Sequence, residues 1–149
     1  MYLELGLTNL AAKEYTRSAK LDADNPEATC GLAMVAGRNG DTEKALAMVD
    51  GVLSTHANDA RAFVARADIY RSAGDDDAAL ADCDAALVVD GGAAIAHRIA
   101  GNIYAERGDQ AAALTAYRAY HDAVPTACDI PAEYINQIVD GIVQDGEEE

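Results

Sequence analysis

Apolar residues along this chain recur at intervals of three and four, which is the spacing of a helix and not the alternation of a strand. A clear stretch is Ala78–Leu87, where the apolar residues form one stripe with Cys83 at its centre. The same spacing continues on both sides of this stretch. It predicts seven helices, near residues 9–21, 26–38, 42–54, 59–72, 76–88, 93–106 and 110–122.

Glycines divide this pattern at a constant interval. They recur every 34 residues, at Gly6, Gly40, Gly74 and Gly108. Glycine adopts the left-handed conformation that ends a helix, and the aspartate that follows three of these glycines suits the start of the next helix. A constant interval of this kind means that the chain consists of copies of one helix pair. Each copy buries its apolar face only by stacking on its neighbours.

Small and aromatic residues keep the same register as the glycines. Alanine stands five residues after each of them, and tyrosine stands four residues before three of them: Ala11, Ala45, Ala79, Ala113, Tyr2, Tyr70 and Tyr104. Over residues 2–125 this register resembles the tetratricopeptide repeat (TPR) family. The resemblance implies an all-α fold, a TPR-type right-handed superhelical solenoid of antiparallel helix pairs.

The resemblance also implies an organisation into repeats within one solenoid domain, residues 1–149. Ile130-Pro131 is expected to begin a terminal capping helix, because proline is tolerated in the first turn of a helix. The expected parts are a half-repeat at 1–25, repeats at 26–59, 60–93 and 94–127, a capping helix at 128–145 and an acidic tail at 146–149.

Several residues depart from the family pattern. Arg66 and Ala100 stand where the family prefers leucine, and His97 stands where it prefers tryptophan. Less apolar volume fills these positions, so looser packing is expected there than in an idealised repeat.

The net charge of −15, with 26 acidic residues against 11 basic ones, argues against nucleic acid and against anionic membranes as partners. The chain contains neither a signal peptide nor an apolar run long enough to span a membrane. Three cysteines without C-x-x-C spacing fit a reducing compartment. These features predict a cytoplasmic protein, although a start that looks truncated leaves an upstream export signal open.

No arrangement of residues in the sequence supports catalysis. Neither a nucleophile–base pair nor a phosphate-binding glycine loop is present, and His56, His97 and His121 lack the spacing of a zinc site. Cys83 falls in a core column, whereas Cys30 lies on the first helix of its repeat and can face the concave surface. The sequence therefore predicts a protein that is not an enzyme and holds no metal or cofactor.

By the resemblance, the first helix of each repeat lines a concave surface. We call the residues carried over to it the lining positions: Cys30, Met34, Arg38, Arg61, Val64, Asp68, Arg71, Ile95, Arg98, Ile99 and Asn102. Arginines among apolar residues suit a peptide or helix that carries apolar anchors and acidic side chains. In the alternative interpretation, these arginines pair with Glu27, Asp68 and Glu106 of the protein itself.

Two functions from different classes remain open. The first is a protein-binding adaptor that holds a partner segment in the concave groove. The second is a structural assembly or oligomerisation module that self-associates or docks through its open N-terminal edge, or a fragment of a larger TPR protein. That edge carries apolar residues, which commonly mark an interface when they are exposed: Tyr2, Leu3, Leu5 and Leu10.

Overall fold

The computed structural model describes residues 8–124 of the chain, and this part is built from helices. The bounds agree with the expected helices to within one residue at each end. The expected capping helix and acidic tail lie outside the described residues. The helices are α1 (Thr8–Leu21), α2 (Pro26–Arg38), α3 (Thr42–Thr55), α4 (Ala60–Ala73), α5 (Asp76–Val89), α6 (Ala94–Glu106) and α7 (Gln110–Ala123).

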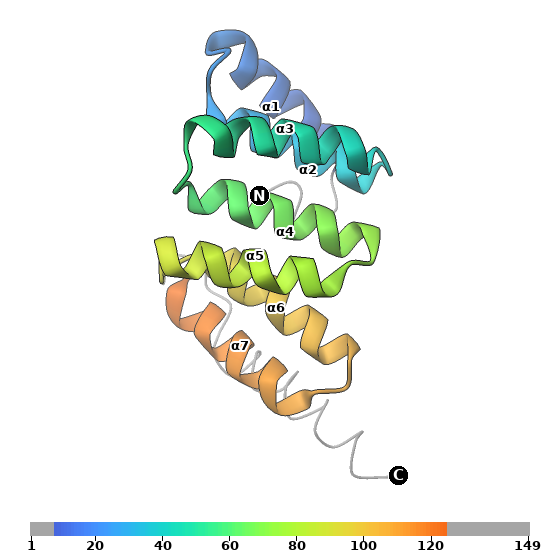
Figure 1. The fold of residues 1–149 in the computed structure, drawn as a ribbon, viewed down its shortest axis with the longest axis vertical. Helices are drawn as coiled ribbons and strands as arrows, with labels where there is room; N and C mark the ends of the chain where they lie inside the picture. Colours follow the sequence, from blue (N-terminus) through green and yellow to red (C-terminus); the bar gives the residue numbers. More distant parts are fainter. Residues whose placement is uncertain (1–7, 125–149) are drawn as a thin grey trace. The chain divides into compact units, whose positions relative to one another are not determined.

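The chain divides into two compact units, Met1–Gly91 and Gly92–Glu149. In unit 1, α2 packs against α3 and α4 packs against α5, and the two pairs meet through α2 with α4 and α3 with α4. Helix α1 contacts α2 and α5 contacts α4, so these two helices lie at opposite ends of unit 1 (Figure 1). In unit 2, α6 packs against α7. This is the helical solenoid expected from the repeated helix pairs.

The repeated glycines make the turns inside the helix pairs. Gly40, Gly74 and Gly108 have φ angles of 94°, 85° and 78°, in the left-handed region that glycine adopts without steric cost. The aspartates that follow two of them accept hydrogen bonds from the next helix. Asp75 accepts from the Ala78 N–H at 3.1 Å and Asp109 from the Ala112 N–H at 3.0 Å. The third, Asp41, makes no side-chain cap hydrogen bond.

Small residues let the helices approach closely. The ring of Tyr15 in α1 lies against Gly31 in α2, where an added Cβ would overlap it. In unit 2 the ring of Tyr117 lies against Gly101, and a Cβ there would stand 2.7 Å from the ring. The two tyrosines occupy the same repeat column, but Tyr15 contacts the first helix of the next repeat, whereas Tyr117 contacts the first helix of its own repeat. Both glycines serve close approach, since a side chain would push the helices apart.

An ionic cluster joins three helices of unit 1. Arg66 of α4 donates two hydrogen bonds of 2.8 Å to Asp82 of α5 and one of 2.9 Å to Asp50 of α3. Its guanidinium carbon also lies 5.8 Å from the centre of the Phe63 ring. Asp82 is buried, and its hydrogen bond is the main cause of the raised pKa of Arg66. Where the family has a packed leucine, this chain therefore has a bidentate ion pair.

Two glycine-to-alanine substitutions should have opposite effects. Gly74→Ala should lower the free energy of unfolding by about 1–2 kcal/mol, because alanine is strained at a positive φ. Gly51→Ala should raise it by about 0.5–1 kcal/mol, because Gly51 lies inside α3 with open space around its Cβ position. Urea unfolding followed by circular dichroism measures both. Equal effects of the two substitutions would contradict the assigned turn.

Restoring the family's leucine should not by itself stabilise the protein. Arg66→Leu leaves the buried Asp82 without its charge partner, so we expect a loss of about 2–3 kcal/mol of unfolding free energy. The double variant Arg66→Leu/Asp82→Ala removes both charges and should recover most of that loss. A double-mutant cycle in urea measures the coupling, and additive effects would show that the pair is not a unit.

Candidate functional site

The lining positions divide between the two units. Those in unit 1 lie on α2 and α4, two helices in direct contact: Cys30, Met34, Arg38, Arg61, Val64, Asp68 and Arg71. Those in unit 2 lie on α6: Ile95, Arg98, Ile99 and Asn102. Within unit 1, positions from different repeats therefore come from neighbouring helices, as the repeat register predicts.

Arg38 is paired inside the protein. Its Nε and Nη2 atoms donate to the two carboxylate oxygens of Asp68 at 3.1 and 3.2 Å. The Asp68 side chain is only 7% exposed and that of Arg38 is 24% exposed. Water screens such a shielded, bidentate pair weakly, so a partner's carboxylate would have to displace an acid already in place. For Arg38 the structure agrees with the alternative interpretation, pairing with an acid of the protein itself.

Arg61 is more accessible. It donates to Asp59 at 2.9 and 3.1 Å and lies 3.7 Å from Glu27, and its own side chain is 58% exposed. Asp59 also caps α4 by accepting the Arg61 backbone N–H. The side-chain hydrogen bond from Arg61 lowers the pKa of Asp59 and raises that of Arg61 itself. Glu27 was expected as a partner of Arg61, whereas Asp59 was not. An acidic residue at a helix N-cap, two residues before an arginine, is the sequence feature that could have predicted this pair.

Two of the expected apolar contacts are covered. Cys30 is 4% exposed and Val64 is 8% exposed, and Cys30 belongs to the core cluster around Ile69. Burial raises the pKa of the Cys30 thiol to about 11, with Asp59 adding to the effect. Met34 is partly buried and packs at the edge of the same core. Of these three side chains, Met34 is thus the one with part of its surface exposed and accessible to a partner.

The positions on α6 show a similar division. Ile99 is buried, whereas Ile95 and Arg98 are partly exposed. The side-chain oxygen of Asn102 accepts a hydrogen bond of 2.8 Å from the Tyr117 hydroxyl. Asn102 therefore helps to hold α7 against α6.

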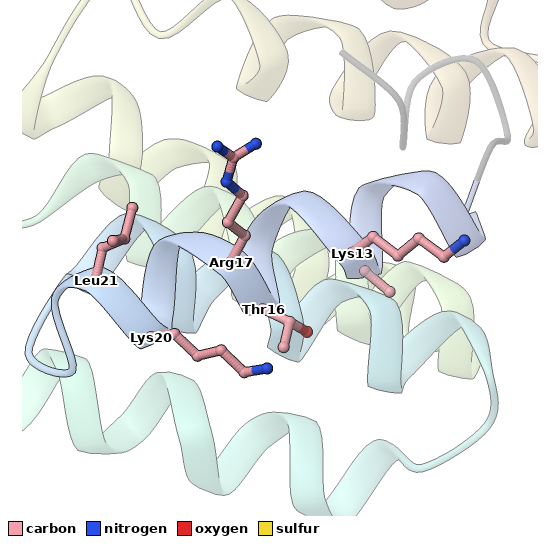
Figure 2. A pocket seen from close by; sticks show the side chains of 6 residues that line it. Lys13, Thr16, Arg17, Lys20 and Leu21 are labelled. Atoms are coloured by element: carbon pink, nitrogen blue, oxygen red, sulfur yellow. The ribbon is translucent and has the colours of Figure 1, made fainter.

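Two shallow hollows occur on unit 1. One borders Arg61, at the α3–α4 loop and the end of α5, and is lined by His56, Ala57, Asn58, Asp59, Ala60, Arg61 and Asp90. The other lies along α1 and is shown in Figure 2; it is lined by Ala12, Lys13, Thr16, Arg17, Lys20 and Leu21. The α1 surface was not predicted as a site, although Lys13, Arg17 and Lys20 stand at helical spacing in the sequence.

Across residues 8–124 there is no group of three or more His, Cys, Asp or Glu side chains that could hold a metal ion. None of the helices in this same stretch is long and apolar enough to cross a membrane.

The tetratricopeptide repeat family model matches the chain twice, at residues 30–93 and 65–127. Together these matches cover more than half of the sequence, so the chain belongs to the TPR family. Proteins of this family are typically non-enzymatic scaffolds. No curated protein matches the sequence.

Solved structures with similar folds are also TPR-like solenoids. The type III secretion translocator chaperone SycD of Yersinia enterocolitica has a TM-score of 0.68 at 16% identity, over 85% of this chain and 88% of its own. A thermophilic TPR protein of Thermus thermophilus has a TM-score of 0.63 at 21% identity, over 79% and 66%. MamA has a TM-score of 0.58 at 20% identity, over 82% and 71%. At these identities the likeness concerns the fold.

The buried thiol of Cys30 should be nearly inert. With a pKa of about 11, its thiolate fraction at pH 8 is small, and burial also blocks access. We expect iodoacetamide to modify it roughly 100-fold more slowly in the folded protein than in urea. Mass spectrometry of the Cys30 peptide over time measures this ratio. Equal rates in the two conditions would show that Cys30 is exposed.

Proposed function

We propose that this chain is a scaffold that holds a peptide or helix of a partner protein against the first helices of its repeats. The TPR fold generally mediates protein–protein interaction, which supports a binding role. A neighbour in fold, SycD, is a type III secretion translocator chaperone. The proposed partner segment carries apolar anchors and acidic side chains.

The exposure of Arg61 is the observation that best supports this proposal. It is a largely exposed cation at a lining position, oriented by Asp59 and bordering a hollow. Its contact with the exposed Glu27 is long, at 3.7 Å, and such surface pairs contribute little, so an incoming carboxylate can replace it. Arg38 is held by Asp68 and is assigned a structural role. Met34 supplies apolar surface next to these charges.

In unit 2, taken by itself, the proposed contacts are Arg98 on α6 and its apolar neighbour Ile95. Both are partly exposed.

Self-association through the N-terminal edge stays a prediction. Tyr2, Leu3 and Leu5 lie outside the described residues. Leu10 lies inside them and is 46% exposed.

Charge reversal at Arg61 tests the proposal. The full chain is immobilised, partners are captured from a lysate of its source and identified by mass spectrometry, and the purified partner is then titrated by calorimetry. We expect Arg61→Glu to weaken this binding by about 10-fold or more, because a carboxylate replaces the clamping cation.

Lys44→Glu is the matched control. It makes the same charge change on α3 at an exposed position outside the lining set, and it should leave the affinity within about 2-fold of the wild type. Circular dichroism checks that both variants fold. A partner that binds the Arg61→Glu variant as tightly as the wild type would contradict the proposal that it binds at the lining positions around Arg61.

A further inference from the structure

Exposed large apolar side chains gather on two helices. In residues 8–124 they are Leu10 and Leu21 on α1, at 46% and 83% exposure, and Val88 and Val89 on α5, at 87% and 41%. Helices α1 and α5 are the two end helices of unit 1 (Figure 1). Large apolar side chains that are exposed together on one helix commonly mark a surface that contacts another molecule.

On α1, three bases lie between the two leucines. Lys13, Arg17 and Lys20 follow Leu10 at helical spacing, so they share its side of the helix, while Ala11 and Tyr15 on the opposite side pack against α2. Figure 2 shows Lys13, Arg17, Lys20 and Leu21 projecting from α1. We call Leu10, Lys13, Arg17, Lys20 and Leu21 the α1 stripe.

The bases of the α1 stripe differ from the other arginines of unit 1 described above. Arg38, Arg61 and Arg66 all pair with acids of the same unit. Lys13, Arg17 and Lys20 make no ion pair with any residue in the described part of the chain. In a chain of net charge −15, a cluster of unpaired bases is a local exception, and it favours an acidic surface as its partner.

Helix α5 offers such a surface. Asp77, Ala81, Asp84 and Val88 recur at helical spacing and are all exposed, while Ala79 and Cys83 on the opposite side are buried. We call the exposed four the α5 stripe. It carries acids where the α1 stripe carries bases, and it ends in the exposed Val88 where the α1 stripe ends in Leu21. The two stripes match in length, since their first and last members are equally far apart along the helix.

We propose that the α1 stripe of one copy docks on the α5 stripe of a second copy. The two stripes of one copy cannot meet, because α1 and α5 lie at opposite ends of unit 1. In the contact the two stripes run parallel, so that Arg17 and Lys13 face Asp84 and Asp77, and Leu21 covers Val88. This surface differs from the N-terminal edge predicted from the sequence, and shares only Leu10 with it.

The contact is heterologous, because each copy uses a different face. Heterologous contacts leave one free stripe at each end, so copies add one after another unless the arrangement closes into a ring. A single helix face on another buries less than the roughly 1,200 Å² of a stable interface, so the association is weak, with a dissociation constant in the micromolar range. Its charged pairs make it weaker at high salt.

Sedimentation velocity of the full chain tests this proposal. At low salt the mass-average size should rise with protein concentration between about 5 and 200 μM, and the rise should shrink in roughly 0.5 M NaCl. Arg17→Glu alone and Asp84→Lys alone should each weaken association by about 10-fold, because like charges then face each other. The chain that carries both substitutions has the net charge of the wild type and should regain association to within about 3-fold.

Two further variants make the result decisive. Leu21→Glu should weaken association as strongly as Arg17→Glu, since it places a charge at an apolar contact. Arg118→Glu makes the same charge change as Arg17→Glu on an exposed position of α7 and should have no effect. A chain that stays monomeric at the highest concentration in low salt overturns the proposal, and so does association that Arg17→Glu leaves unchanged or that the double substitution fails to restore. Arg61→Glu should not alter self-association, so a negative result for self-association does not contradict the proposed groove, and the reverse also holds.

Discussion

Close helix approach over very small side chains is the constraint on which this structure depends. The core has alanines such as Ala33, Ala45 and Ala79 at 0% exposure, and its largest fully buried side chains are Ile69, Ile103, Val49 and Cys83. The chain has one phenylalanine and no tryptophan. Small side chains bury little apolar area each, so the helices must lie close and every pair needs its neighbour. This is why tyrosine rings can lie directly on Gly31 and Gly101, and why the repeat tolerates no side chain at either position without moving a helix.

Ion pairs between helices add contacts that a core of small side chains does not provide. Arg66 connects α4 to α5 and α3, and Arg38 connects α2 to Asp68 of α4. In both pairs the aspartate is the buried partner, so the arginine compensates a charge that would be costly to leave alone. A chain with 26 acidic residues and only 11 basic ones thereby uses several of its bases internally. The cations left for other molecules are those that have no acidic partner or that remain largely exposed beside one, and in unit 1 these include the bases of the α1 stripe and Arg61.

The helices and turns could be predicted because their causes are local. Periodicity sets each helix, and Gly74 at φ 85° makes a turn whatever surrounds it. Side-chain partners could not be predicted in the same way. Arg66 occupies a column where the family prefers leucine, and the sequence does not show that Asp82 of α5 lies 2.8 Å from it as an ionic partner. Cys30 and Val64 fall in lining columns of the repeat, yet neighbouring residues cover both. Column position gives the side of the helix, whereas burial depends on which side chains the adjacent helices supply, and this varies from repeat to repeat.

Partner binding and self-association are proposed on different residues, so one does not exclude the other. Arg61 and Met34 belong to neither stripe, and a copy joined to others through α1 and α5 still presents them. A row of such copies would repeat the same weak site at a regular interval. A partner that carries several matching segments, or that is itself assembled, would then bind by avidity. Linked sites of this kind exceed the affinity of a single site by about 10²–10⁴-fold without a new contact, provided the spacing matches. A weak interface between copies would in this way raise the effective affinity of a groove whose exposed apolar surface is small, because its single contacts would act together.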